Sequence, residues 1–305
     1  MSDVEGVPGA DIATPPLPAK RRGELESSSS NISVQEHKRS WNTRNLGLRL
    51  GSDVAAAASA GALVAPIITV IDRSIIENAS GRAPLISSIK SSLQDALLRP
   101  HRFVFCKPFG LIYLLYFGTY LTSNALDTVS STLTPSSAST TTSGAPKFIA
   151  TSTANLSLCL YKDQAFTKLF GASTSSPRPI PKASYALFAL RDCLTIFASF
   201  NVPPLLAPLL PLSHSVEETV SRASIAQFIA PAAVQLVSTP LHLLGLDLYN
   251  RPAGEKVNWT SRLSKVRKDW LVSCAARVGR IVPAFGMGGV VNAGVRARLM
   301  GRLEQ

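Results

Sequence analysis

The sequence predicts an all-α membrane protein in which six transmembrane helices form three pseudo-symmetric repeats of two helices each. A low share of charged residues, six long uncharged segments and a recurring set of landmarks predict this fold. Charged residues make up 16% of the 305 residues and hydrophobic residues 46%, whereas charged residues are about 25% of a typical soluble protein. Mean hydropathy is +0.18. A water-soluble surface built from this composition would be short of charge.

The charges that are present are mostly basic. Lys and Arg number 31 against 19 Asp and Glu, which gives a formal net charge of +12. Such an excess is typical of nucleic-acid binding and also of loops that lie against anionic lipid headgroups. Long uncharged segments favour the lipid interpretation. We therefore expect membrane lipids with anionic headgroups as partners, and no nucleic acid.

The amino-terminal region differs in composition from the rest of the chain. Residues 1–50 are rich in Pro, Ser, Gly and charge and contain the stretch TPPLPAKRRGELESSSSN, which is typical of a disordered polar tail. The first residues, MSDVEG, contain acids and no apolar run, so they predict neither a secretory signal nor an Arg-rich transit peptide. We expect residues 51–305 to form the membrane domain.

Six uncharged, mostly apolar segments follow the tail. A helix needs about 20 such residues to cross a bilayer, because every backbone polar group must be paired inside the segment. The segments are residues 54–71, 109–126, 148–161, 193–212, 223–246 and 281–295. Two of them are short, and prolines must break the second half of 193–212. The set nevertheless predicts six membrane helices.

The links between these segments alternate in charge. The links from odd to even segments are rich in Lys and Arg, and the last of them reads RPAGEKVNWTSRLSKVRKDW. The link from the second to the third segment, STLTPSSASTTTSGAP, is nearly free of charge. Positive loops tend to share one side of a membrane. The pattern predicts that the three odd-to-even loops lie on one side and both termini on the other.

Landmarks recur along the segments and indicate an internal repeat. The first landmark is Pro66, Asn155 or Pro240, each followed by an apolar turn and then by an acid and a base. These acid and base positions are Asp72 with Arg73, Lys162 with Asp163, and Asp247 with Arg251. The second landmark is a basic residue near the start of each even-numbered segment: Lys107, Arg191 and Arg280. The predicted repeats are residues 52–130, 146–212 and 222–303.

These landmarks resemble those of the mitochondrial carrier family, whose three repeats each have two membrane helices and a short surface helix. Pro66 and Pro240 match the proline at which the odd helices of that family kink. The pair Arg191-Asp192 and the stretch from Arg280 to Pro283 match the entry of its even helices. Residues 85–98, LISSIKSSLQDALL, fit the surface helix, with one apolar face made of Leu85, Ile89, Leu93 and Leu97.

The sequence departs from the carrier pattern where that family closes its gates. The family has an acid just after the kink proline, whereas this chain has Ile68 after Pro66 and His242 after Pro240, and Asn155 replaces the proline of the second repeat. The acids of this chain lie further along. The resemblance therefore implies a mitochondrial-carrier-like bundle in a divergent, atypical member of the family.

The repeat and the resemblance together define the candidate site residues. The predicted ligand-binding residues are Lys107, Arg191, Arg280 and His242, and we expect Arg191 and Arg280 to face a shared central cavity. The predicted helix-kink and gate residues are Pro66, Asp72, Arg73, Asn155, Lys162, Asp163, Pro240, Asp247 and Arg251.

Arg191 is the most informative of these charges. It stands between the apolar stretches YALFAL and CLTIFASF, and an arginine at mid-helix costs roughly 2.5 to 3.5 kcal/mol on insertion scales. Because the neighbouring Asp192 points elsewhere on a helix, the sequence predicts a partner on another segment or an anionic ligand. The alternative is that Arg191 reaches the membrane interface. His242 is either functional at membrane depth, or faces a loop or bonds a neighbouring helix.

The sequence contains no GxxxxGK[ST], HExxH or GxSxG motif, and its four separate cysteines predict no zinc site. We expect no enzyme activity, no cofactor and no metal. The resemblance implies a multi-pass protein of the inner or outer mitochondrial membrane that transports a small anionic solute, with cardiolipin among its lipid partners. The alternative is a non-transporting mitochondrial scaffold or adaptor with a degenerate carrier fold.

Overall fold

A computed structural model describes residues 41–134, 136–139, 141–172, 179–211, 222–251 and 258–304. Throughout these ranges the regular elements are helices, which confirms the predicted all-α class. Residues 41–305 form one compact unit, and residues 1–40 of the predicted tail lie outside the described residues. The helices are α2 (Leu46–Ser80), α3 (Leu85–Leu98), α4 (Pro100–Val104), α5 (Lys107–Leu133), α6 (Ala145–Phe170), α7 (Lys182–Asn201), α8 (Pro203–Leu206), η1 (Ala207–Leu209), α10 (Arg222–Asn250), α11 (Trp259–Gly279), η2 (Val282–Gly288) and α12 (Gly289–Glu304).

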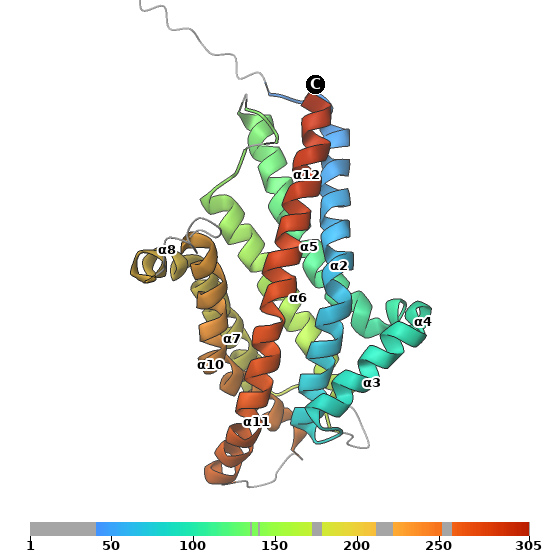
Figure 1. The fold of residues 1–305 in the computed structure, drawn as a ribbon, viewed down its shortest axis with the longest axis vertical. Coiled ribbons are helices and arrows are strands. Elements are labelled where there is room, and N and C mark those ends of the chain that lie inside the picture. Colours follow the sequence, from blue (N-terminus) through green and yellow to red (C-terminus); the bar gives the residue numbers. More distant parts are fainter. Residues whose placement is uncertain are drawn as a thin grey trace, which may run out of the picture. The chain divides into compact units, whose positions relative to one another are not determined.

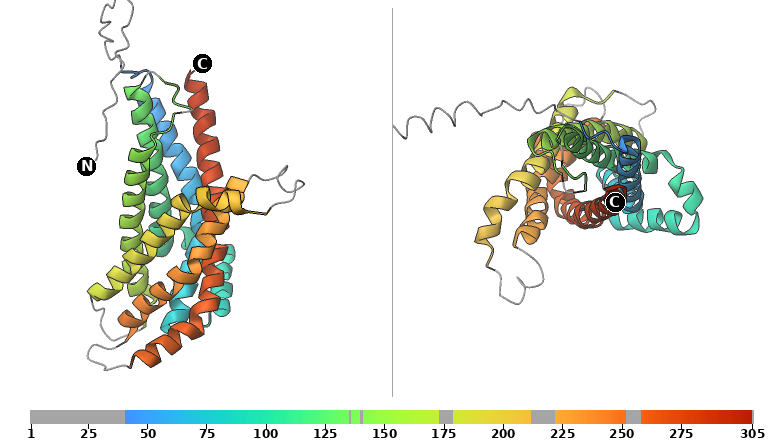
Figure 2. Two further views of the ribbon diagram at one scale, coloured as in Figure 1. Left: turned by 90° about the vertical axis from the view of Figure 1, so that its left-hand side faces the viewer. Right: turned by 90° about the horizontal axis from the view of Figure 1, so that it is seen from above.

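The long helices pack against their neighbours in chain order (Figures 1 and 2). α2 packs against α5, α5 against α6, α6 against α7, α7 against α10 and α10 against α11, and α12 returns to α2. Two hydrogen bonds tie the start of α2 to the ends of α5 and α12. The Asn42 amide donates to the Thr132 carbonyl (2.9 Å), and the Asn45 side chain donates to the Leu303 carbonyl (3.4 Å). The core of the bundle therefore lies between helices from both ends of the chain.

Fewer than six helices qualify as membrane spans by length and composition. Within the described residues three do so, over Leu46–Ser80, Ile225–Asn250 and Trp259–Glu304. A fourth results if Lys182–Ser199 and Pro203–Leu209, which are bent by 44°, form one span. The bend follows from Pro203 and Pro204, which break the predicted fourth segment. α5 and α6 do not qualify, and both carry buried charges: Asp127 on α5, and Lys162 and Asp163 on α6.

Prolines interrupt the hydrogen bonds of two spans without ending them. Pro66 lies inside α2, and Pro240 lies inside α10. A proline has no N–H, so the carbonyl four residues earlier loses its helical partner. At Pro240 that carbonyl belongs to Leu236, and it accepts a hydrogen bond from the Trp270 indole of α11 (3.0 Å). The neighbouring helix thus replaces the missing donor, as is usual for prolines in membrane helices.

A glycine allows α7 and α10 to approach closely. A Cβ atom added to Gly245 would lie 2.6 Å from the ring of Phe188, whose side chain is fully buried. The Ser184 hydroxyl, one turn earlier on α7, donates to the Gly245 carbonyl (2.9 Å). Small residues at such contacts are typical of membrane helix pairs. The contact fixes α7 against α10 and so positions the residues that both helices contribute to the interior.

The short helix α3 contacts α2 through polar groups and exposes apolar ones. Ser88 bonds Ser74 (3.0 Å) and Glu77 of α2, while Ile86 and Leu97 are 77% and 72% exposed. The predicted apolar face is therefore divided, since Leu85 is buried whereas Leu93 and Leu97 are exposed. An exposed apolar surface on a helix beside a membrane bundle is typical of an interfacial helix.

Candidate functional site

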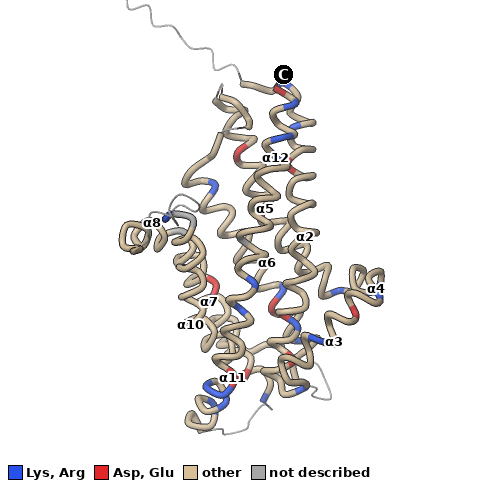
Figure 3. The backbone as a smooth tube through the Cα atoms, in the orientation of Figure 1, with Lys and Arg blue, Asp and Glu red and all other residues tan. Residues whose placement is uncertain are grey.

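Lys, Arg and Asp positions gather on several helices toward the end at which α3 and α11 lie (Figure 3), and their side chains line a shared cavity. We call the following residues the inner charge cluster: Asp72 of α2, Lys162 and Asp163 of α6, Arg191 and Asp192 of α7, His242 of α10, and Arg277 and Arg280 at the end of α11. All of them are buried except Arg280, which is partly exposed. Charges at this depth are costly unless they are paired.

Carboxylates in this cluster join cations from different helices. Asp72 accepts from Lys162 Nζ (2.8 Å) and from Arg280 Nη1 (2.7 Å), which joins α2 to α6 and α11. Asp163 lies 2.5 Å from both Lys162 Nζ and Arg191 Nη2, which joins α6 to α7. Breaking one partner of a buried pair costs about 3 to 5 kcal/mol. The cluster therefore holds four helices together.

Arg191 is only 1% exposed and has three partners. Its Nη2 donates to Asp163 (2.5 Å) and to Asp192 (2.6 Å), and its Nη1 lies 3.0 Å from Nδ1 of His242. Arginine only donates, so Nδ1 accepts and the hydrogen bond assigns the proton of His242 to Nε2. The predicted partner on another segment is confirmed in Asp163. The prediction that Asp192 points elsewhere is wrong, because its carboxylate turns back to the guanidinium.

A small cavity lies among these side chains. It is lined by Asp72, Ile75, Ile76, Lys162, Asp163, Arg191, His242, Arg277 and Arg280. Only roughly one water molecule fits in it, whereas pockets for small ligands usually measure about 300 to 1,000 Å³. In this conformation the ion pairs close the interior to a solute as large as an amino acid.

The structure places some predicted ligand-binding and gate residues in this cavity and others elsewhere. Arg191, Arg280 and His242 line it, together with Asp72, Lys162 and Asp163. Lys107 is exposed at the start of α5 and does not line it. Arg73 pairs with Glu77 one turn further along α2 (2.8 Å) and lies 3.7 Å from Asp95 of α3. Asn155 lies within α6, and its side chain accepts from Thr119 of α5 (3.3 Å).

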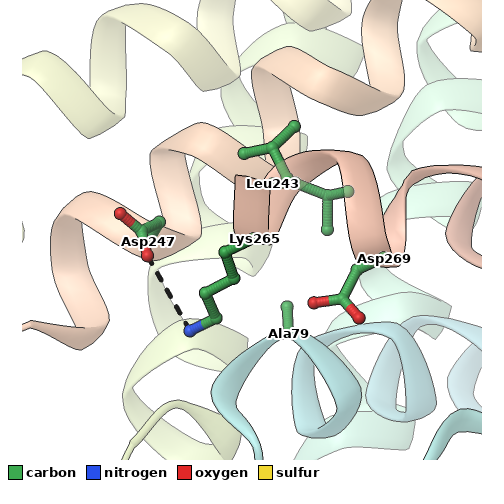
Figure 4. A pocket seen from close by; sticks show the side chains of 6 residues that line it. Ala79, Leu243, Asp247, Lys265 and Asp269 are labelled. Carbon is green, nitrogen blue, oxygen red and sulfur yellow. Dashed lines mark ion pairs between the residues drawn. The ribbon is translucent and has the colours of Figure 1, made fainter. Parts of the chain in front are cut away.

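Asp247 and Arg251 belong to a separate group of charges at the junction of α10 and α11. Asp247 accepts from Arg251 (2.9 Å) and from Arg262 (2.9 Å), and Lys265 lies 3.8 Å away (Figure 4). The third acid and base pair of the predicted repeat thus does not reach the cavity. In the part of the chain that the structure describes, no three His, Cys, Asp or Glu side chains gather as metal ligands.

Sequence reasoning missed Arg277, Gln235 and the role of Asp192. Arg277 is 2% exposed, lines the cavity and donates from Nε to Gln235 of α10 (2.9 Å). Its place one turn before Arg280 on the same helix was the available signal, because residues three apart share a helix face. Gln235 stands inside the apolar segment 223–246, where an uncharged polar residue gives only a weak signal.

A second buried group, which we call the terminal polar cluster, joins the start of α2 to the ends of α5 and α12. Asp53 is fully buried and accepts from Arg296 Nε (2.8 Å) and from the Thr128 hydroxyl (2.5 Å). Asn124 and Asn292 exchange two hydrogen bonds (2.8 and 2.9 Å). The predicted site included none of these residues.

The two clusters are separated by about the thickness of a bilayer core. Asp53 and Asp72 are 72 − 53 = 19 residues apart on the same helix, which is roughly 28 Å at about 1.5 Å per residue. The hydrocarbon core measures about 30 Å, and the stretch of α2 between the two acids is free of charge. α2 therefore has the pattern of a span with one buried ionic group near each face.

A helical bundle with apolar spans and a buried ionic cavity belongs to the class of helical membrane proteins with an internal polar site. Such sites are typical of transporters. Residues 56–300 match the model of the family described as "probable citrulline exporter". The match covers most of the chain, and the protein belongs to this family. A comparison with curated proteins finds no match.

The family match corrects the predicted resemblance. The chain belongs to a probable exporter family and contains no detected mitochondrial carrier domain, so its assignment to the mitochondrial carriers is wrong. The landmarks that suggested it are not specific to carriers, because basic residues flank many membrane helices and prolines are tolerated within them. The expected mitochondrial location rested on that resemblance and loses its basis. A transporter embedded in a membrane remains the supported class.

Proposed function

We propose that this protein carries a small zwitterionic amino acid of the citrulline class across a membrane, by way of the inner charge cluster. The observation that carries the proposal is the buried ionic cavity between α2, α6, α7, α10 and α11, in a chain whose family is described as a probable citrulline exporter. An amino acid has a carboxylate and an ammonium group, and the cavity offers side chains of both signs.

The ion pairs of the cluster suit a transport cycle because a zwitterion can replace them. Lys162, Arg191 and Arg280 each contact a carboxylate in the closed structure. A substrate carboxylate and ammonium can take over such contacts, so opening the cavity does not leave charges unpaired. A ligand shifts the balance between closed and open states only by its differential affinity for them. The substrate forms ion pairs with these cations only when the internal ion pairs are broken, so it binds the open state more tightly than the closed one.

The purified full chain in liposomes tests this function. We expect vesicles loaded with labelled L-citrulline to release it in exchange for external L-citrulline and other neutral polar amino acids, and more slowly for ornithine or a dicarboxylate. Liposomes without protein are the control. Exchange of dicarboxylates alone would indicate an anion transporter instead. A panel without any exchange would favour a non-transporting membrane scaffold.

We also propose that all six apolar segments predicted from the sequence cross the bilayer. In this arrangement neighbouring helices shield α5 and α6 from lipid, and α3 lies at the membrane surface. Ser139 lies near Glu304 at the α12 end, to which it donates a hydrogen bond (2.8 Å), whereas Ser264 lies on α11. In a chain without native cysteines, Ser139→Cys and Ser264→Cys should react with an impermeant maleimide from opposite sides of sealed vesicles. Reaction of both from one side would contradict six spans.

A further inference from the structure

Arg277 differs from the other cations of the inner charge cluster in having no carboxylate partner. Among the described residues, no Asp or Glu oxygen lies within ion-pair distance of its guanidinium. Its one hydrogen bond runs from Nε to the neutral Gln235 side chain (2.9 Å), and its Nη1 and Nη2 donate to no described residue. An arginine that is 2% exposed is costly to leave in this state.

The charge balance of the cluster points the same way. Its cations are Lys162, Arg191, Arg277 and Arg280, and its carboxylates are Asp72, Asp163 and Asp192. His242 accepts a hydrogen bond from Arg191 and so counts as neutral. One positive charge is therefore left over, and it lies on the side chain that faces the cavity without a counter-ion.

Gln235 fixes the orientation of this arginine. It is 3% exposed, and its Oε1 accepts from Arg277 Nε (2.9 Å) and from the Ser238 hydroxyl (3.1 Å). Its Nε2 donates to the Pro231 carbonyl (2.9 Å), so the amide is held at both ends. With Nε occupied, the paired Nη1 and Nη2 edge stays available, and this edge of a guanidinium can bind a carboxylate through two parallel hydrogen bonds.

We infer that Arg277 binds the carboxylate of the transported amino acid, and that Gln235 positions its guanidinium for this contact. The inference rests on the proposed function and names the substrate group that this side chain recognises. The substrate carboxylate supplies the missing negative charge of the cluster. Gln235 is a positioning residue, because it acts through Arg277.

Two substitutions of nearly equal size at Gln235 test the inference in the liposome assay. Gln235→Glu places a carboxylate against Arg277, and we expect L-citrulline exchange to fall about tenfold or more, the scale of one charged hydrogen bond. Gln235→Met shares with it the loss of the hydrogen bond to Pro231, also loses those from Arg277 and Ser238, and adds no charge. We expect a smaller fall, of about threefold, because Arg277 loses its positioning contact but its Nη1 and Nη2 edge stays available.

Two further comparisons test the arginine itself. Arg277→Lys should lose exchange, because an ammonium cannot make the two parallel hydrogen bonds of a guanidinium. Arg267→Lys, at an exposed position of the same helix, should leave exchange unchanged. L-Citrullinamide, whose carboxylate is replaced by a neutral amide, should compete poorly with L-citrulline for the parent protein.

The outcomes separate this inference from the proposed function. If the parent exchanges L-citrulline but Gln235→Glu and Gln235→Met behave alike, or L-citrullinamide competes as well as L-citrulline, the Arg277 site is overturned while the function stands. If the parent exchanges no amino acid, the function fails, and thermal unfolding of the purified chain decides the site. Stabilisation by L-citrulline, absent with L-citrullinamide and lost in Gln235→Glu, supports it. No such stabilisation overturns it.

Discussion

Asp72→Asn is expected to lower the thermal unfolding midpoint of the purified protein strongly, because it removes the acid that Lys162 and Arg280 share. Their contacts to Asp72, at 2.8 and 2.7 Å, join α2 to α6 and α11. An asparagine has nearly the same shape, but it lacks the charge and directs an amide N–H₂ toward a cation. Leaving buried cations without their partner costs about 3 to 5 kcal/mol.

The control is Asp95→Asn on α3, since this carboxylate is 56% exposed and lies 3.7 Å from Arg73. Exposed pairs contribute about 0 to 1 kcal/mol, so its unfolding midpoint should stay near that of the parent in the same detergent. Adding Lys162→Met to Asp72→Asn removes a cation that has lost a partner and should restore part of the stability. If Asp72→Asn unfolds like Asp95→Asn, the cluster does not hold the helices together.

The sequence predicted the helical class correctly but not the ends of the helices. The uncharged segment 54–71 stops at Asp53 and Asp72, whereas α2 runs from Leu46 to Ser80. The helix continues because both acids are paired inside the bundle, Asp53 with Arg296 and Asp72 with Lys162. A search for uncharged runs treats every charge as a boundary. It therefore misses buried pairs whose partners lie far away in the sequence.

The same limit explains which site residues could be predicted. Arg191 and His242 were recognisable because a charged or ionisable group within an apolar segment calls for an explanation. Lys107 and Asp247 were included by repeat symmetry, and the structure places them outside the cavity. Arg277 was missed because its significance depends on contacting Gln235 and on having no carboxylate within ion-pair distance among the described residues, which is a property of the packed helices.

Arg296→Leu is expected to destabilise the opposite end of the bundle by a similar amount. The guanidinium donates to Asp53 (2.8 Å), to the Ala138 carbonyl (3.1 Å) and to the Thr128 hydroxyl (3.1 Å), so it joins α12 to α2 and α5. Its loss leaves Asp53 fully buried with Thr128 as the remaining side-chain donor. Such an uncompensated carboxylate costs about 3 to 5 kcal/mol.

A double-mutant cycle separates this ionic effect from lost packing. Asp53→Leu alone should destabilise the protein comparably, because it leaves Arg296 unpaired, whereas the double variant should be more stable than the sum of the single effects predicts. Arg298→Leu, at an exposed position of α12, is the matched control and should change the unfolding midpoint little. Strictly additive effects in the cycle would mean that Asp53 and Arg296 do not stabilise each other, and α12 would then be held by its apolar contacts.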